Sequence, residues 1–474
     1  MDTKKLRQKI LDLAIRGKLV PQDPNDEPAS VLLERIRAEK ERLIKEGKIK
    51  RSKKSASDTP HYRNEVPFEV PESWEWVKLW DMTSVIGDGL HGTPQYDITG
   101  DYFFINGNNL LNRQILIKDD TKRVSLEEYE KYKKPLNDTT ILVSINGTIG
   151  NVGTFKDEKV ILGKSACYFN IFPFLIKDYI CTVIESQYFL KYALSSATGS
   201  TIKNVPLQAI NEFLVPIPPI AEQKRIIVAI EQWLSIVGAL ENEKNDLFKN
   251  IQQSKAKILD LAIHGKLVPQ DPNDEPAIEL LTRINPKFTP CDNAHDDNQL
   301  PNSWCWTTLG SIFQHNTGKA LNKSDFQEGQ LKPYLTTSNV YWNCFDFTEV
   351  KEMHFKDSEL EKCTITKGDL LVCEGGDIGR AAIWNYDYDI CIQNHIHRLR
   401  AKGNVCQILY LYVLMLYKWR DRINGKGIEL QSLSSGLLDK LVVPLPPINE
   451  QLRIVAKIEE LFAVLDEIQK SIEA

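Results

Sequence analysis

The sequence lacks the motifs of several classes of enzyme. It contains no G-x-x-x-x-G-K-[S/T] loop for nucleotide phosphates and no N/D-P-P-aromatic motif of amino-methyltransferases. The E-x-K fragment of a nuclease site occurs at Glu46-Gly47-Lys48, but it stands in a charged segment without the aspartate that should precede it. His395 and His397 alone have a metal-like spacing, within a strand-like run, and we expect no metal there. The sequence therefore predicts no catalytic residue and no metal site.

Paired cysteines and long apolar runs are also missing. The nine cysteines are odd in number and form no C-x-x-C pair, and seven of them lie from Cys291 onward, which favours free thiols in a reducing cytosol. The N-terminus is charged and lacks the apolar core of a signal peptide, and no apolar run approaches the ~20 residues of a membrane span. We therefore expect a cytoplasmic protein with no membrane partner.

The composition is typical of a globular protein. Hydrophobic residues make up 42% of the 474 residues and charged residues 26%. This length corresponds to about two to four domains. The net charge of −5 argues against a protein that coats nucleic acid without regard to sequence. It is compatible with sequence-specific binding, because a local basic strip is enough to attract phosphates.

A long internal repeat is the main feature of the sequence. Residues 10–29 read ILDLAIRGKLVPQDPNDEPA, and residues 258–277 repeat this segment except that His264 replaces Arg16. Shorter repeats follow in the same order: PESWEW at 71–76 and PNSWCW at 301–306, DTTILVSINGTIG at 138–150 and KGDLLVCEGGDIG at 367–379, and VPIPPIAEQ at 215–223 and VPLPPINEQ at 443–451. The segments between these motifs differ. The chain therefore contains two copies of one frame with different contents.

Apolar residues follow each P-P-I motif with the spacing of a coiled coil. Their steps alternate between four and three residues, with gaps at Lys244 and Ser254. This spacing predicts long helices that pair along a seam, either as a plain spacer or to set the distance between two domains. The seam runs through Ile226, Ile230, Trp233, Val237, Leu240, Leu247, Ile251 and Ile258, and again through Ile454, Ile458, Leu461, Leu465, Ile468 and Ile472. By the repeat alignment, the two chain ends together make the second copy of the central helix. We expect the long helices to pair antiparallel.

The rest of the sequence predicts mixed domains. Helices are expected within 1–29 and 29–54 and near 188–197 and 407–420, and the remainder of 71–220 and 301–448 suggests strands, turns and short helices. The G-x-G-x-x-G match at 87–92 is interpreted as a turn or polar loop, because Thr93-Pro94 follows where a helix should begin. The basic stretch 45–54, which the second half lacks, is either a contact for phosphate or protein or a solvated helix end.

Polar clusters between the repeated motifs are the candidates for reading bases. Asparagine and glutamine suit the edge of adenine, and arginine and lysine suit that of guanine. A structural role is the alternative for each residue. The candidates are Asn106, Asn108, Asn109, Ser144, Asn146, Lys164 and Ser165 in the first half, and Lys319, Thr336, Thr337, Asn339, Arg380, Gln393 and Asn394 in the second.

Together the motifs resemble the specificity subunit of type I restriction–modification systems. The resemblance covers nearly the whole chain and rests on the box within 10–29 and 258–277, P-x-S-W-x-W at the start of each half, G-T-P at 92–94, G-D-x-L followed by G-x-I-G, and P-x-P-P-I-x-E-Q at the end of each half. In that family each variable half is a target recognition domain that reads one part of a split DNA target. The first half departs from the pattern with D-T-T-I-L at 138–142, where the second has G-D-L-L at 368–371.

The resemblance implies an α+β fold, with two mixed α/β target recognition domains joined by two long antiparallel coiled-coil helices in a pseudo-twofold circular arrangement. We expect a conserved helical region at 1–70, recognition domains at 71–220 and 301–448, a central helix and linker at 221–300, and a C-terminal helix at 449–474. The residues expected to pair helices or hold partners are Ile226, Ile230, Trp233, Val237, Ile454, Ile458, Leu461 and Leu465.

The resemblance also implies a function and partners. The chain would be a non-catalytic subunit that binds double-stranded DNA and docks two methyltransferase subunits, with two restriction subunits as further partners. S-adenosylmethionine, ATP and magnesium would belong to those partners. The alternative is a free-standing bipartite DNA-binding or scaffold protein without methyltransferase partners. A self-sufficient enzyme is disfavoured by the missing motifs.

Overall fold

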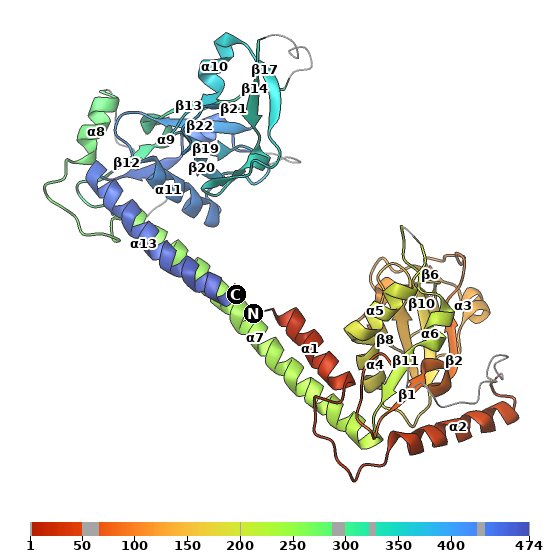
Figure 1. The fold of residues 1–474 in the computed structure, drawn as a ribbon. Helices are drawn as coiled ribbons and strands as arrows, with labels where there is room; N and C mark the ends of the chain where they lie inside the picture. The colour runs from red at the N-terminus through yellow and green to blue at the C-terminus, as the bar shows by residue number, and fades with distance from the viewer. Residues whose placement is uncertain are drawn as a thin grey trace. The chain divides into compact units, whose positions relative to one another are not determined.

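The protein forms two compact units, Met1–Glu243 (unit 1) and Lys244–Ala474 (unit 2). The structure is a computed structural model that describes residues 2–49, 66–199, 201–286, 299–321, 329–423 and 432–473 (Figure 1). Within these ranges no helix combines the length and the apolarity needed to cross a membrane. The basic stretch predicted at 45–54 lies outside the described residues beyond Ile49, so its role stays a prediction.

Unit 1 places two helices before a domain rich in strands. Its main sheet has the order β2-β10-β7-β8, with β10 antiparallel to both neighbours, and a smaller sheet has the order β6-β3-β9, with β3 and β9 parallel. The helices are α1 (Thr3–Ile15), α2 (Ala29–Lys45), α3 (Leu126–Tyr132), α4 (Lys177–Glu185), α5 (Gln187–Ser196), α6 (Leu207–Glu212) and the 3₁₀ turns η2 (Leu79–Met82) and η3 (Gly107–Asn109). The strands are β1 (Glu75–Lys78), β2 (Thr83–Asp88), β3 (Tyr102–Ile105), β4 (Leu110–Leu111), β5 (Gln114–Ile115), β6 (Arg123–Val124), β7 (Thr140–Ser144), β8 (Val152–Thr154), β9 (Val160–Leu162), β10 (Ala166–Ile171) and β11 (Leu214–Ile217).

Unit 2 repeats this plan. Its main sheet has the order β13-β22-β19-β20, and its second sheet the order β17-β14-β21-β18, with β14 and β21 parallel. The helices are α8 (Ala277–Ile284), α9 (Leu309–Ile312), α10 (Asp357–Cys363), α11 (Gln407–Trp419), α12 (Ser435–Asp439), α13 (Ile448–Glu473) and the turn η5 (Thr337–Asn339). The strands are β12 (Cys305–Thr308), β13 (Phe313–Thr317), β14 (Gln330–Leu335), β15 (Val340–Tyr341), β16 (Cys344–Phe345), β17 (Lys351–Phe355), β18 (Thr364–Ile365), β19 (Leu370–Cys373), β20 (Ala381–Ile383), β21 (Ile390–Ile392), β22 (Ile396–Ala401) and β23 (Val442–Leu445).

The helix α7 (Ile220–Ile263, 44 residues) contributes its first part to unit 1 and its last part to unit 2. In unit 1, α1 packs on it: Ile10 and Leu11 share a core with Ile226 and Ile230, and Arg7 Nη2 lies 2.8 Å from Glu241 Oε2. The early residue Arg7 contacts the later part of the helix, so α1 runs antiparallel to α7 (Figure 1).

In unit 2, α13 packs on the last part of α7 in the same antiparallel sense (Figure 1). Lys255 of α7 pairs with Asp466 and lies over the ring of Phe462, 5.2 Å from its centroid. Closer to the domain, Leu259 shares a core with Ile454 and Ile458. Both chain ends therefore pair with the central helix, as the heptad spacing predicted.

The buried seam is narrower than the heptads suggested. Of the residues expected to pair helices or hold partners, Ile226, Ile230, Val237, Ile454 and Ile458 are buried, and Leu461 and Leu465 are half-buried. Trp233 is 50% exposed and Leu240 and Leu247 are also exposed, so these three do not lie in the seam. A single helix partner covers only one stripe of a long helix, which leaves the other apolar positions uncovered.

Two of the repeated motifs meet where α1 and the corresponding end of α7 stop. Each helix ends at a glycine with positive φ, Gly17 (67°) and Gly265 (64°), and the next amide donates to the carbonyl five residues back. A Cβ at Gly17 would lie 2.4 Å from Cγ of Pro71, and one at Gly265 would lie 2.3 Å from Cγ of Pro301. Glycine is therefore required twice over, by its backbone angle and by the proline of the P-x-S-W motif.

The tryptophan of that motif completes a buried junction with the E-Q pair that follows P-P-I. Trp74 Nε1 donates to Glu222 Oε2 at 2.9 Å, and Gln22 Nε2 donates to the other oxygen at 2.6 Å. In unit 2, Trp304 Nε1 donates to Glu450 at 2.8 Å and Gln270 donates to the same carboxylate. We call these two sets the junctions. Burial raises the pKa of Glu222 and of Glu450, and the donated hydrogen bonds oppose that rise.

The glutamine of the E-Q pair ties α7 and α13 to their domains. Gln223 Nε2 donates to the carbonyl of Pro218 at 2.9 Å, and its Oε1 accepts from the amide of Ile176 at 3.1 Å. Gln451 makes the same two contacts, with Pro446 and Cys406. The sequence motifs that repeat are therefore the residues that fix each long helix to its domain.

The first half departs from the G-D-x-L motif at 138–142, and another buried pair takes the place of the contact that the aspartate of this motif makes in unit 2. In unit 1, Thr140 Oγ1 donates to Asn170 Oδ1 at 2.7 Å across β7 and β10. The aligned residues of unit 2 are Asp369 and Arg400, whose ion pair has an N–O distance of 2.6 Å. A neutral pair in one unit thus replaces a charged pair in the other, and the fold is unchanged.

Candidate nucleic-acid interface

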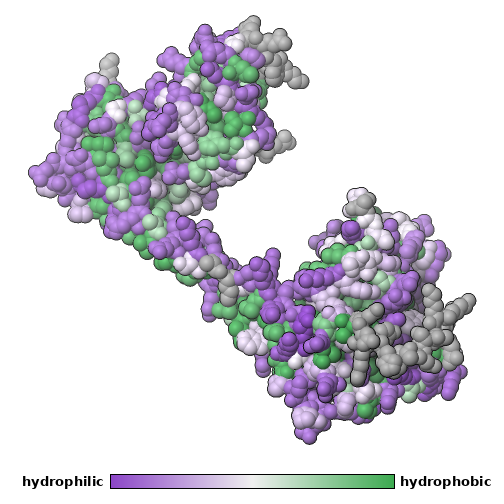
Figure 2. All heavy atoms as spheres, in the orientation of Figure 1, coloured by the Kyte–Doolittle hydropathy of each residue, from purple (hydrophilic) through white to green (hydrophobic). Residues whose placement is uncertain are grey.

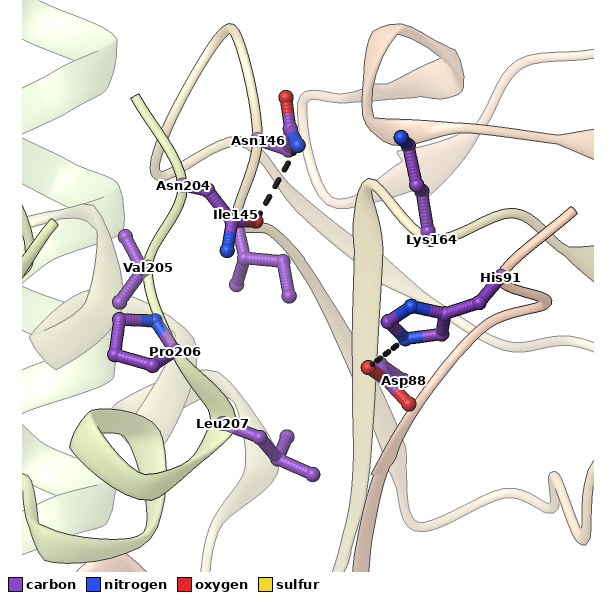
Figure 3. Close-up of a pocket in the computed structure, with 9 residues that line it drawn as sticks. All are labelled: Asp88, His91, Ile145, Asn146, Lys164, Asn204, Val205, Pro206 and Leu207. Carbon is purple, nitrogen blue, oxygen red and sulfur yellow. Dashed lines mark hydrogen bonds and ion pairs between the residues drawn. The ribbon is translucent and has the colours of Figure 1, made fainter. Parts of the chain in front are cut away.

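Loops from separate parts of unit 1 meet at one end of its main sheet around a hollow of about 360 Å³ (Figure 3). They are the segment after β2, the loop between β7 and β8, the turn between β9 and β10, and the segment before α6. We call the residues that line the hollow loop cluster 1: Asp88, His91, Ile145, Asn146, Lys164, Asn204, Val205, Pro206 and Leu207.

Backbone contacts hold these loops together. The amide of Leu90 donates to Leu162 O at 2.7 Å, that of Ile145 to Ser165 O at 2.9 Å, and that of Val205 to Ile145 O at 2.8 Å. Gly89 allows the first of these approaches, because a Cβ there would lie 2.2 Å from Gly163 O. The G-x-G-x-x-G match was predicted as a turn or loop; its first two residues, Gly87 and Asp88, instead end strand β2, and the rest is a loop in which Gly89 permits close packing of two backbones.

Polar side chains of loop cluster 1 remain available at the surface. Asn146 Nδ2 donates to Asn204 Oδ1 at 3.3 Å, which leaves the Asn146 oxygen and the Asn204 amide for other partners. His91 Nε2 lies 2.6 Å from Asp88 Oδ2. Lys164 is exposed, and its side chain extends to the same side of the cluster as that of Asn146 (Figure 3). Amides and a cation on one face suit base edges and phosphates.

Unit 2 builds the same backbone frame with other side chains. The amide of Lys319 donates to Ile392 O at 3.1 Å, that of Glu374 to His395 O at 2.9 Å, and that of Leu433 to Glu374 O at 2.9 Å. These bonds match those of Leu90, Ile145 and Val205. Residues of the matching loops form loop cluster 2: Ala320, Glu374, Gly375, Asn394, His395 and Leu433. His395 Nδ1 lies 3.6 Å from Glu374 Oε2.

The predicted base-reading residues therefore divide into two groups. Asn146 and Lys164 lie in loop cluster 1 and Asn394 in loop cluster 2, with the half-buried Gln393 next to it. The others lie outside the clusters, and most of these have side chains bound to their own domain. Whether any of them touches DNA stays a prediction.

Four of the others cap matching 3₁₀ turns. Asn109 accepts from the amide of Asn106 at 3.0 Å and donates to Leu116 O at 2.9 Å, and Asn339 accepts from the amide of Thr336 and donates to Asp346 O in the same way. Asn109 and Asn339 are 6% and 3% exposed. These bonds use the amides to hold a short hairpin. Asn108, on the same turn, is exposed.

Ser144, Ser165 and Lys319 are also bound within their domains. Ser144 is fully buried, donates to Thr148 O and accepts from the amide of Asn151. Ser165 Oγ donates to Asn106 Oδ1 at 2.9 Å. Lys319 is 7% exposed, and its Nζ lies 2.8 Å from Glu359 Oε2. Their geometry accounts for them as structural residues.

Arg380 packs against the 3₁₀ turn of unit 2. Its Nη2 donates to Thr337 O at 2.6 Å, and its guanidinium carbon lies 4.6 Å from the centroid of the Tyr341 ring. In unit 1 the aligned Asn151 reaches the carbonyl of Gly107 at 3.5 Å. The contact is thus part of the shared frame, which explains Arg380 and Thr337 together.

His91, Asn204, Glu374 and His395 were not among the predicted residues, although loop clusters 1 and 2 include them. Asn204 and Glu374 lie far along the chain from their neighbours in space, so no local pattern marks them. His91 and His395 each stand close to a residue already singled out. Among the described residues, no three histidine, cysteine, aspartate or glutamate side chains are grouped as metal ligands.

Two units with one backbone frame and different polar side chains at the same loop cluster define a tandem recognition protein. The family model of the type I restriction modification DNA specificity domain matches residues 71–250 and 301–474, and the chain belongs to this family. The chain is 28% identical to the type I restriction enzyme EcoAI specificity subunit of Escherichia coli, over 98% of this chain and 90% of that protein. The EcoEI specificity subunit of the same species is 26% identical, over 99% and 91%.

A solved structure shares the fold. A chain from a study of complex assembly and conformational transition of the type I R-M system has a TM-score of 0.56 at 16% identity, and the match covers 86% of this chain and 94% of that chain. These comparisons confirm the predicted family and fold class. They also confirm the prediction of a non-catalytic specificity subunit, because the relatives are specificity subunits.

Proposed function

We propose that this chain is the DNA-recognition subunit of a type I restriction–modification complex, and that each unit reads one part of a bipartite target. The observation that carries the proposal is the pair of loop clusters, which share their backbone hydrogen bonds and differ in side chains. In each unit the shared frame places the loop cluster at the same end of that unit's main sheet. The differing side chains give each cluster its own preference for bases.

The side chains favour different contacts in the two units. In loop cluster 1, the Asn146–Asn204 pair offers an amide oxygen and an amide N–H, which match the edge of adenine, and Lys164 suits a phosphate or guanine. In loop cluster 2, Glu374 offers an acceptor of the kind that matches the amino group of cytosine, and Asn394 offers an amide. Two unlike half-sites are therefore expected.

A domain exchange tests the bipartite reading. Residues 71–220 are replaced by the aligned segment of a relative with a different target, and the methylated motif in the host genome is sequenced before and after. We expect one half of the motif to change and the other to stay. The matched exchange of 301–448 should change the other half. A change in both halves, or in neither, would contradict the proposal.

We further propose that two identical methyltransferase subunits dock on the long helices. Trp233, Ile236 and Leu240 are exposed on α7, and the aligned residues of α13 include Val464 and Ile468, which are 53% and 42% exposed. Figure 2 shows apolar side chains at the surface of this helical region. Two of these three apolar positions are exposed in both units, so the surfaces suit two copies of one partner.

Charged substitutions test the stoichiometry. Ile236→Asp and Val464→Asp are made singly and together, with Gln232→Asp, an exposed polar position on α7, as the control. Native mass spectrometry should show one methyltransferase lost in each single variant, both lost in the double variant and none in the control. Full assembly in the double variant would refute this docking surface. A wild type that binds no methyltransferase would instead favour the alternative of a free-standing bipartite DNA-binding or scaffold protein.

We propose that the cofactors bind to the partner subunits and not to this chain. The complex is proposed to act in the cytoplasm. S-adenosylmethionine would bind the methyltransferase subunits, and ATP and magnesium the two restriction subunits. Calorimetric titration of the purified chain with each ligand should give no heat of binding, whereas the assembled complex should bind all three. Binding of S-adenosylmethionine by the chain alone would overturn this assignment.

A further inference from the structure

A continuous chain of hydrogen bonds runs through unit 2 beside loop cluster 2. Asp439 Oδ1 on α12 lies 2.8 Å from His315 Nδ1 on β13, and His315 Nε2 lies 2.9 Å from His397 Nδ1 on β22. His397 Nε2 then lies 2.8 Å from the carbonyl oxygen of Leu433. His397 is fully buried, and the His315 side chain is 8% exposed.

The two ends of this chain fix the number of protons that it needs for every contact to be a hydrogen bond. A carbonyl oxygen only accepts, so His397 Nε2 carries a hydrogen and, in a neutral ring, His397 Nδ1 accepts from His315 Nε2. His315 Nδ1 then faces the carboxylate of Asp439, which also only accepts when ionised. The contact becomes a hydrogen bond when His315 carries a hydrogen on both nitrogens. All three contacts are therefore hydrogen bonds at the same time only when the chain holds one proton more than two neutral imidazoles.

Burial excludes the extra proton from His397. Burial lowers the pKa of His397 to about 4, so this ring is neutral near pH 7. The extra proton then lies between His315 and Asp439, whose side chain is 41% exposed and keeps contact with water. A charge in direct contact with a carboxylate is far less costly to hold at this depth than an unpaired one.

Unit 1 lacks this chain at the same three positions. The residues aligned with His315, His397 and Asp439 are Ile86, Cys167 and Asn211. Cys167 is fully buried, and Asn211 Oδ1 is buried without a hydrogen-bond partner among the described residues. Val205, which aligns with Leu433, is held in unit 1 by its backbone bond to Ile145. The proton-bearing chain is thus an addition to the shared frame.

We propose that the Asp439–His315–His397 chain is a positioning device for DNA reading by unit 2, and that its extra proton makes this half of the recognition sensitive to pH. This rests on the proposed function. His397 holds the carbonyl of Leu433, and the amide of Leu433 donates to Glu374 O in loop cluster 2. Loss of the proton sets two acceptors against each other at 2.8 Å, which loosens the segment 432–434 and with it Glu374.

Few other charges act on the chain. His395 stands on the turn before β22 and pairs with Glu374, and its positive form disfavours a second charge on His397. Lys402 donates to Gly310 O on α9, which packs beside Asp439. Arg398 follows His397 in β22 but points to the other face, where it donates to Asn316 Oδ1. None of these replaces the hydrogen bond between Asp439 and His315.

Asp439→Asn tests the proton directly. Asparagine at 439, the residue of unit 1, donates an N–H to a neutral His315, so the whole chain is satisfied without the extra proton. Hydrogen exchange of segment 432–439 is measured by mass spectrometry in the full chain from pH 6.5 to 8.5, after correction for intrinsic rates. In the wild type we expect protection to fall by up to about tenfold per pH unit, the slope for one proton. The variant should show no such slope, and segment 204–211 of unit 1 should show none in either protein.

A second measurement connects the proton to recognition. With the assembled complex, the ratio of Kd values for the target and for DNA changed in the half-site of unit 2 is followed over the same pH range. We expect the wild-type ratio to fall with rising pH and the Asp439→Asn ratio to stay level. Equal exchange slopes in both proteins would overturn the proton chain, and a level wild-type ratio would overturn its role in reading. Failure of the proposed function would look different, as no discrimination at either half-site at any pH.

Discussion

In unit 1 the buried pair that joins β7 to β10 is neutral, Thr140 with Asn170, whereas unit 2 holds Asp369 and Arg400 at the same two positions. The junctions, in contrast, are the same in both units down to the donor and acceptor atoms. The difference teaches which residues the frame requires. The positions that fix the long helix to its domain hold the same residues in both units, whereas these two positions of the sheet hold a neutral pair in one unit and a charged pair in the other, each with its own hydrogen bonds satisfied.

The loops differ more than the sheets. Loop clusters 1 and 2 keep their backbone hydrogen bonds while a lysine aligns with an asparagine, an isoleucine with a glutamate and an asparagine with a glycine. Side chains that point away from the frame do not affect its packing. They are therefore free to carry specificity, which is what a pair of readers with different half-sites needs.

The largest effect is expected from substitutions in the buried helix seam, which is the same in both units. Ile230→Asp and Ile458→Asp place a charge at aligned, buried positions of α7 and α13, which are 3% and 0% exposed. We expect each to lower the free energy of unfolding by ~3–5 kcal/mol, because an unpaired charge is buried. Urea unfolding followed by circular dichroism measures this. Wild-type midpoints for either variant would contradict the buried seam.

A smaller effect is expected when the ion pair that is particular to unit 2 is broken. Arg400→Asn leaves Asp369, which is 2% exposed, without its ion-pair partner and should cost about 2 kcal/mol. The double variant Asp369→Thr/Arg400→Asn installs the pair of unit 1. We expect thermal unfolding to recover most of the loss in the double variant. Additive losses would show that the two pairs are not interchangeable.

The two junctions are expected to lose the same stability when the same substitution is made in each. Trp74→Phe and Trp304→Phe each remove one donor from a buried glutamate and keep most of the ring, so each should cost about 1–2 kcal/mol. Thermal unfolding of both variants provides the measurement. Because Glu222 and Glu450 have raised pKa values, protonation relieves them, and both losses should shrink as pH is lowered toward 4. A loss confined to one unit would show that the junctions differ in strength.

The smallest effect sharpens the comparison of the loops. If Lys164 contacts a phosphate, Lys164→Ala should weaken all DNA sequences alike and reduce the slope of log K against log salt by about one. Asn394→Ala, at the aligned position of unit 2, should leave that slope unchanged, because asparagine carries no charge. Fluorescence anisotropy at several salt concentrations separates the two. A change limited to one base position in Lys164→Ala would mean that it reads a base.

Much of the fold could be predicted from the sequence because the two halves of the chain can be aligned with each other. The box at 10–29, repeated at 258–277, and the heptads after P-P-I predicted the long helix α7, its antiparallel partners and the role of both chain ends. The helices predicted at 188–197 and 407–420 correspond to α5 and α11. The second helix was predicted to 54 but ends at Lys45, because periodicity marks a helix more reliably than its last residue. The helix α4 was not predicted.

The candidate site was accessible only in part. The sequence singled out polar residues between the motifs, and Asn146, Lys164 and Asn394 do reach the loop clusters. It could not separate these from Asn109, Asn339 or Ser144, which have the same polarity but are buried and bound to the backbone. The residue type shows only that a side chain can form hydrogen bonds. Its position in the fold decides whether those bonds are used within the domain or are available to DNA.

The sequence by itself determined the duplicated frame, the pairing of the helices and the family, because repetition and apolar spacing are properties of the order of residues alone. Only the tertiary structure decided which side chains face outward at the loop clusters and which three residues of unit 2 form a proton-bearing chain. His315, His397 and Asp439 are separated by up to 124 positions and meet only when β13, β22 and α12 pack together. Contacts of that range follow from the packing of strands, which no local pattern records.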